Sequence, residues 1–172
     1  MNAGMFHPKG QPVGLHIAQG KEWFPINTQE GYGNFFMKPN GIFGIERDDT
    51  PFIVSTSRYL QRQKDSPRLA TQSGPMLLEN GNIHPELQPE SKNFHIRNAV
   101  GVTKEKNVIF VISLEPVRFY ELALLLRDVY RCTDALYLDG AISVLHTPQH
   151  PEIKKGTGLG GILIVGDKSK SP

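Results

Sequence analysis

The sequence contains a single cysteine, Cys132, among its 172 residues. One cysteine cannot form an internal disulfide and cannot build a cysteine-rich metal site. A run of about 18 apolar residues is missing, and so is an opening basic segment followed by an apolar stretch. We therefore expect neither a membrane span nor a signal peptide within this chain.

An excess of charge of either sign is missing as well. The 19 Lys and Arg side chains are nearly balanced by 17 Asp and Glu, leaving a formal net charge of +2. Nucleic-acid-binding domains usually carry a clear basic surplus or a basic stripe. We therefore expect no nucleic acid partner. The Walker phosphate loop, the dinucleotide fingerprint and the G-x-S-x-G elbow are also absent.

What the sequence does contain is a series of short runs of strand length, separated by turn residues. The runs lie at 13–20, 41–47, 68–74, 97–103, 107–113, 135–140 and 161–166. Asn80-Gly81 and the segment 104–106 are typical of hairpin turns, and Asn40-Gly41 is expected to turn the chain in the same way. The pattern predicts antiparallel pairing.

One long amphipathic helix is predicted over residues 116–131. Its apolar side chains form a single stripe, and Pro116 suits the first helical turn. The stripe consists of Phe119, Leu122, Ala123, Leu126, Val129 and Tyr130. The helix joins two of the predicted strands into a strand–helix–strand unit that leads to Asp139. A shorter helix is expected at 56–63, capped by Ser55.

The fold class predicted from these patterns is α+β. We expect mixed, largely antiparallel sheets of short strands with the one long helix. Residues 1–166 are expected to form a single domain, and residues 167–172 a flexible tail rich in Ser, Lys and Pro.

Asp139 is the first candidate site residue. It directly follows the apolar run "ALYL" and precedes Gly140. If the two strands of the strand–helix–strand unit share one sheet, they are parallel, and Asp139 lies at the sheet edge where such folds bind ligands. An Asp-Gly turn without further role explains the same residues, so spacing alone leaves both interpretations open.

The other polar candidates are equally open. Arg97 starts a predicted strand, where an arginine is either exposed or available to bind a phosphate or carboxylate with its planar fork. Ser73 and Gly74 form a strand break whose backbone N–H groups could hold an anion, and a tight turn is the alternative. The six histidines are scattered, and His146 and His150 flank Pro148, so we predict no histidine metal site.

Four segments in order resemble the hallmark segments of phosphodiester glycosidase domains, the family related to the lysosomal uncovering enzyme. They are "NAGMF" at 2–6, "QSGPMLLENG" at 72–81, "RNAVGV" at 97–102 and "LYLDGAIS" at 136–143. The segment "GNFFMKPNGIF" at 33–43 is similar to a bacterial branch of that family. The resemblance covers nearly the whole chain.

The resemblance implies cleavage of a sugar-1-phosphodiester, which releases the sugar from a phosphomonoester. Asp139 is then the nucleophile or general base at the anomeric carbon, while Arg97 and backbone N–H groups near Ser73 and Gly74 hold the phosphate. Asn2, Gly140 and Ser143 are expected to contact sugar or phosphate oxygens. The candidates for a second carboxylate are Glu30, Asp134 and Glu152.

Two departures from the family pattern qualify the resemblance. The family usually has "LDGGGS" where this chain has "LDGAIS", which alters the glycine-rich contact after the aspartate. Several strands normally precede the first segment, which here begins at residue 2, so we expect a longer protein. The resemblance suggests that the full-length protein works in the periplasm or otherwise outside the cytoplasm. A noncatalytic sugar-phosphate or cell-wall polymer module and an inactive truncated remnant are the alternative interpretations. The residues demand no cofactor, and a divalent cation held near Asp139 and phosphate oxygens is compatible with them.

Overall fold

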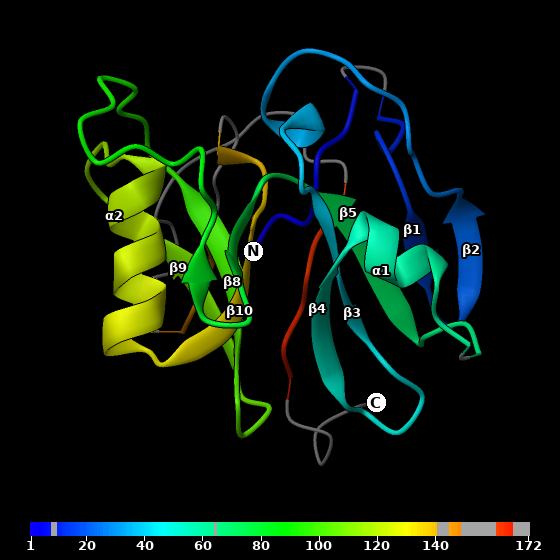
Figure 1. Cartoon of the computed structure of the whole chain (residues 1–172). Coiled ribbons are helices and arrows are strands. Elements are labelled where there is room, and N and C mark those ends of the chain that lie inside the picture. Colours follow the sequence, from blue (N-terminus) through cyan, green and yellow to red (C-terminus); the bar gives the residue numbers. More distant parts are fainter. Residues whose placement is uncertain (8–9, 64, 141–144, 149–160, 167–172) are drawn as a thin grey trace.

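A computed structural model describes residues 1–7, 10–63, 65–140, 145–148 and 161–166 (Figure 1). The predicted tail, Ser143 and Glu152 lie outside these residues. Two five-stranded sheets dominate, and every strand pairing among the described residues is antiparallel. The predicted α+β class with largely antiparallel sheets is therefore confirmed.

The first sheet has the strand order β2-β1-β5-β3-β4. Its strands are β1 (His16–Ala18), β2 (Lys21–Phe24), β3 (Gly41–Ile45), β4 (Pro51–Ser55) and β5 (Leu69–Ser73). Helix α1 (Thr56–Leu60) follows β4, as predicted, although the Ser55 side chain makes no capping hydrogen bond. A 3-10 turn, η1 (Asn34–Phe36), precedes β3.

The second sheet has the order β7-β6-β10-β8-β9. Its strands are β6 (Met76–Glu79), β7 (Asn82–Ile83), β8 (Asn98–Thr103), β9 (Val108–Ile112) and β10 (Cys132–Tyr137). β8 lies between β9 and β10 and is antiparallel to both, so β9 and β10 run in the same direction. The predicted strand–helix–strand unit is thus present, with one strand inserted between its two strands.

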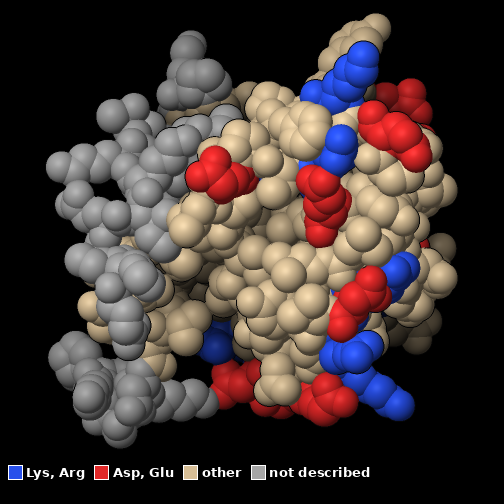
Figure 2. All heavy atoms as spheres, turned by 90° about the vertical axis from the view of Figure 1, so that its left-hand side faces the viewer, with Lys and Arg blue, Asp and Glu red and all other residues tan. Residues whose placement is uncertain are grey.

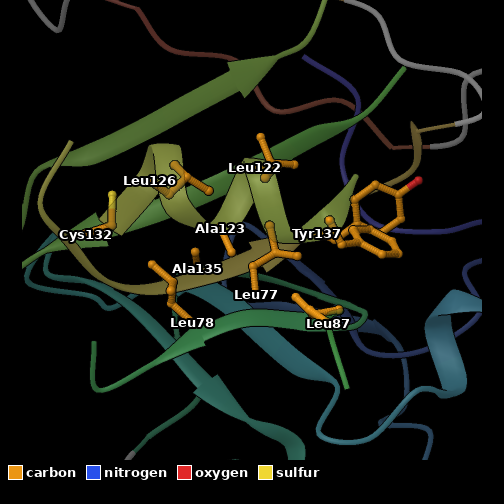
Figure 3. Packing of buried hydrophobic residues seen from close by; sticks show 11 residues of the cluster. Leu77, Leu78, Leu87, Leu122, Ala123, Leu126, Cys132, Ala135 and Tyr137 are labelled. Atoms are coloured by element: carbon orange, nitrogen blue, oxygen red, sulfur yellow. The ribbon is translucent and has the colours of Figure 1, made fainter. Parts of the chain in front are cut away.

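The molecule is layered, with the two sheets face to face and α2 on the outer face of the second sheet (Figure 1). Alternate residues of β8 and β10 point to opposite faces, because successive side chains of a strand alternate. Val100 and Leu136 therefore join the cluster between the sheets, while Ala99 and Ala135 pack against the helix. Figure 3 shows the helix side of this core.

The long helix predicted for 116–131 is not confirmed in that form. The helical segment is α2 (Phe119–Leu124), continued by a π-helical stretch, η2 (Leu125–Val129). Pro116 does not start it, because Val117 pairs with His95 in an isolated β-bridge and holds the preceding chain extended. The first part of the predicted stripe is buried, whereas Val129 and Tyr130 are exposed.

The two Asn-Gly pairs predicted as turns behave differently. Asn80 and Gly81 have φ angles of 50° and 79° and connect β6 to β7, as predicted. Asn40-Gly41 is not a turn, which corrects our prediction. The Asn40 side chain is buried and bonds the Phe35 carbonyl and the Thr56 hydroxyl, and Gly41 already starts β3.

The strand predicted at 161–166 is reduced to one bridge, between Ile162 and Asn2. This bridge places the first residues of the chain beside that late segment. Gly4 donates its backbone N–H to the Thr71 hydroxyl at 3.2 Å. The amino-terminal segment therefore runs from the first sheet towards the end of β10.

Candidate active site

Asp139 lies just beyond the carboxyl end of β10 and is partly buried. On one side of this strand end, Leu138 donates its backbone N–H to the Asn98 carbonyl at 3.2 Å. On the other side, Tyr137 donates to the Pro75 carbonyl at 3.1 Å. The segments 72–81, 97–102 and 136–140, far apart in the sequence, thus meet at one end of the second sheet.

Asn2 brings the amino-terminal segment to the same place. It is 2% exposed, and its Nδ2 donates to the backbone carbonyl of Asp139 at 2.9 Å. Asn98 Nδ2 in turn donates to Asn2 Oδ1 at 2.7 Å. Asn2 therefore holds the backbone of Asp139 and is itself held by Asn98, which suits a residue whose carboxylate has to be kept in one position.

Sequence reasoning missed Asn98, although a signal was present. Asn98 lies two and four residues before Val100 and Val102, so it shares their inward face of β8. A fully buried amide among aliphatic neighbours is unusual unless its polar atoms have partners. A polar residue at this position of an apolar strand face was the signal.

Two buried polar atoms near this strand end have no hydrogen-bond partner among the described residues, namely Ser73 Oγ and Asn98 Oδ1. Ser73 ends β5, and the cis peptide bond between Gly74 and Pro75 leads directly into β6. Gly74 is required for packing, because a Cβ there would come within 2.7 Å of Asn40 Cβ and 2.8 Å of the Phe35 carbonyl oxygen.

Arg97 occupies a different place from the one predicted. It is 1% exposed, and its guanidinium lies 3.6 Å from the centroid of the Phe119 ring. Nε donates to the Val117 carbonyl at 2.8 Å, and Nη2 donates to the Asn93 carbonyl at 3.0 Å. A guanidinium enclosed in this way orients its neighbours, and the direct hold on a phosphate stays a prediction. Burial lowers the pKa of Arg97, and Tyr137 opposes that change.

Tyr137 connects Arg97 to the backbone beside Asp139. Its hydroxyl oxygen accepts the Gly140 N–H at 2.8 Å, and its ring centroid lies 5.7 Å from the Arg97 guanidinium. Burial raises the pKa of Tyr137, the Gly140 N–H and Arg97 oppose this, and the charge of Asp139 raises it again. The tyrosine hydroxyl is therefore close enough to Asp139 to respond to its charge.

Gly140 is confined by the same contact. A Cβ at this position would collide with the Tyr137 hydroxyl and come within 2.9 Å of the Ile96 carbonyl oxygen. Only glycine permits this close approach. The Gly140 N–H donates to the Tyr137 hydroxyl. The substrate contact predicted for Gly140 stays a prediction.

The set of candidates for the second carboxylate can be reduced. Asp134 accepts hydrogen bonds from the Asn80 backbone and the Thr133 hydroxyl, near the opposite end of β10. Asp134 lies five positions before Asp139 along nearly extended chain, a distance of about 16 Å. Asp134 is therefore a structural residue, which corrects its candidacy. Glu30 is exposed in the loop after β2.

The described residues offer no ready metal centre. Nowhere in 1–7, 10–63, 65–140, 145–148 and 161–166 do three or more His, Cys, Asp or Glu side chains gather as a metal site would require. No helix among these residues is long and apolar enough to cross a membrane.

On the face that carries α2, Lys and Arg side chains lie among Asp and Glu side chains (Figure 2).

Comparison with known proteins supports the resemblance seen in the sequence. A family model described as phosphodiester glycosidase matches residues 1–146. The uncharacterized protein YigE of Escherichia coli K12 is 35% identical over 150 residues, which are 85% of this chain and 56% of that protein.

Two solved structures match this chain, and the first of them is similar in fold. The catalytic domain of zebrafish N-acetylglucosamine-1-phosphodiester alpha-N-acetylglucosaminidase, auto-inhibited by its pro-peptide, matches with a TM-score of 0.58 and 23% identity, covering 81% of this chain and 49% of that one. A hypothetical protein from Synechocystis matches with a TM-score of 0.45 and 15% identity, over 81% of this chain and 45% of its own. The chain thus spans about half the length of the relatives it matches.

Proposed function

This chain belongs to the phosphodiester glycosidase family, and on that premise we propose that it hydrolyses a sugar-1-phosphodiester with Asp139 as nucleophile or general base. The observation that carries the proposal is the position of Asp139, at the point where the four family segments meet. Its backbone is bonded by Asn2, and the next residue is bonded by Tyr137.

The reaction breaks the bond between the anomeric carbon and the phosphate oxygen, whose electron pair leaves with the phosphomonoester. As a nucleophile, the Asp139 carboxylate bonds the anomeric carbon and water later releases the sugar. As a general base, it removes a proton from a water molecule that attacks the same carbon. A phosphomonoester is a good leaving group, so holding its charge replaces much of the work of a second acid.

The groups proposed to contact the substrate change with the structure. Ser73 and Gly74 keep the role proposed from the family pattern, in which backbone N–H groups near them hold the phosphate. Ser143 keeps its proposed contact with sugar or phosphate oxygens from the same pattern. Asn2 and Arg97 are proposed to position Asp139 and its surroundings. A divalent cation, if one is used, would be held by the Asp139 carboxylate together with phosphate oxygens.

The test is release of free sugar from a panel of sugar-1-phosphodiesters, with and without divalent cations and a chelator. We expect Asp139→Asn to fold normally and to lower kcat at least ~1,000-fold, equivalent to about 4 kcal/mol of barrier. The matched control is Glu105→Gln, an exposed carboxylate in the turn between β8 and β9, at the opposite end of β10 from Asp139, which should keep full activity. Full residual activity in a folded Asp139→Asn protein would refute the assignment.

A further inference from the structure

An open groove of about 550 Å³ runs along the free edge of the first sheet. Its walls come from the amino-terminal segment, from β1 and from β2. The described lining residues are Phe6, Gly10, Gln11, Pro12, His16, Ala18, Gln19 and Trp23. Its volume is within the range of small-molecule sites, roughly 300–1,000 Å³.

Trp23 is the dominant apolar surface of this groove. It is the only tryptophan of the chain and is 62% exposed, although it belongs to a strand. The Lys21 ammonium lies 4.3 Å from the ring centroid but does not line the groove. The ammonium lies over one face of the indole, so a ligand in the groove has to pack on the other face.

The polar side chains among the described lining residues are the amides of Gln11 and Gln19 and the imidazole of His16. Gln11 and Gln19 are both exposed, and each side chain offers two donors and one acceptor oxygen. No Asp, Glu, Lys or Arg is among the described lining residues. The lining therefore favours a neutral ligand rich in hydroxyl groups over an anion or a cation.

Gln19 also has an unusual backbone. Its φ is 54°, and together with Gly20 at 73° it forms the turn between β1 and β2. Two-residue turns of this kind strongly favour Asn, Asp or Gly at that position. A longer amide kept there at a conformational cost is consistent with a role for its side chain in the groove.

We propose that this groove is an accessory glycan-binding site that takes a neutral pyranose unit. One face of a pyranose consists largely of C–H groups, which pack on the indole of Trp23. The hydroxyl groups at its rim bond the amides of Gln11 and Gln19. Catalysis by Asp139 plays no part in this binding.

The groove is also placed to hold a longer substrate. Phe6 packs edge-on against His16 with the ring centroids 5.8 Å apart, and it lies four residues after Asn2. Four residues span at most about 14 Å. A glycan held by Trp23 therefore remains within a few sugar units of Asp139.

Trp23 provides its own probe, because this 172-residue chain has no other tryptophan to contribute to the fluorescence. The chain is titrated with neutral tetrasaccharides of glucose, mannose and N-acetylglucosamine. We expect at least one to shift the emission and to protect Trp23 from acrylamide. By calorimetry, Trp23→Ala should weaken that binding at least tenfold. Gln19→Asn, which suits the turn better but shortens the amide, should weaken it several-fold without loss of stability.

Two control variants test whether binding belongs to the groove. Tyr32→Ala removes an exposed aromatic side chain outside the groove and should leave the affinity unchanged. Asp139→Asn should bind as wild type does, so a failure of the catalytic proposal leaves this test intact. The proposal is overturned if no tetrasaccharide binds, if Trp23→Ala binds normally, or if Asp139→Asn abolishes binding. It is also overturned if Trp23 is shielded from acrylamide in the free chain.

Discussion

A single hydroxyl group at Tyr137 links the buried Arg97 to the backbone that follows Asp139. Tyr137→Phe keeps the ring against Phe119, at a centroid distance of 4.7 Å, but leaves the buried Gly140 N–H without this acceptor. The loss of one such hydrogen bond costs about 0.5–1.5 kcal/mol, and here it also loosens the turn at Asp139.

We expect kcat of Tyr137→Phe to fall about tenfold or more on any phosphodiester that the wild type hydrolyses, with a smaller change in KM. Steady-state kinetics well below the melting temperature measure the split between the two constants. Tyr130→Phe is the matched control, because Tyr130 is 43% exposed. A Tyr137→Phe enzyme with wild-type kcat would show that this hydroxyl does not position the site.

The segments that form the candidate site could be predicted from the sequence, because they follow one another in the order typical of the family. Asp139, Asn2 and Ser73 are found by the family pattern alone, and the structure brings their segments to one place. The position of Arg97 could not be predicted, because its burial depends on Phe119 and Tyr137, which lie 22 and 40 residues further along the chain.

At the level of whole elements, α2 and η2 pack on the second sheet at Gly101. A Cβ there would lie 2.5 Å from Cys132 Sγ and 3.2 Å from Leu126 Cδ2. Gly101→Ala therefore overpacks the contact between helix and sheet, and we expect it to lower the free energy of unfolding by about 1–3 kcal/mol.

Cys132→Ala removes the sulfur that causes the collision, so the double variant should be less destabilised than the sum of the single variants by about 1 kcal/mol or more. Urea unfolding of all four proteins measures this coupling. Gly166→Ala is the control, because a Cβ at Gly166 meets nothing within 4 Å. Strict additivity would mean that the helix shifts to relieve the contact.

The same distinction between local and distant information explains which elements could be predicted. The hairpin at Asn80-Gly81 depends on two adjacent residues and was correct. The start of α2 depends on the pairing of Val117 with His95, 22 residues earlier, and was wrong. β4 was missed because it begins with Pro51, which weakens a strand pattern but is tolerated in an edge strand such as this one.

For the molecule as a whole, two buried acidic groups set an upper pH limit to stability. Burial, with a smaller contribution from Asp134, raises the pKa of the Cys132 thiol from 9.0 to about 11. Burial also raises the pKa of Tyr137. Both groups therefore keep their protons in the folded chain at pH values where the unfolded chain has lost them, and this difference favours unfolding.

The direction of the pH dependence follows from these raised pKa values. The contribution of Cys132 is fully present below about pH 9, where both states are protonated, and is lost as the pH rises towards 11. We expect a loss of about 2–3 kcal/mol in the free energy of unfolding over this range from the thiol alone. Urea unfolding at a series of pH values measures this loss.

The control is Cys132→Ala, which should be less stable than wild type at pH 7 but should lose less stability between pH 9 and 11. Tyr137 accounts for the remaining decline above about pH 10. Parallel curves for wild type and Cys132→Ala would show that the thiol ionises alike in the folded and unfolded chains.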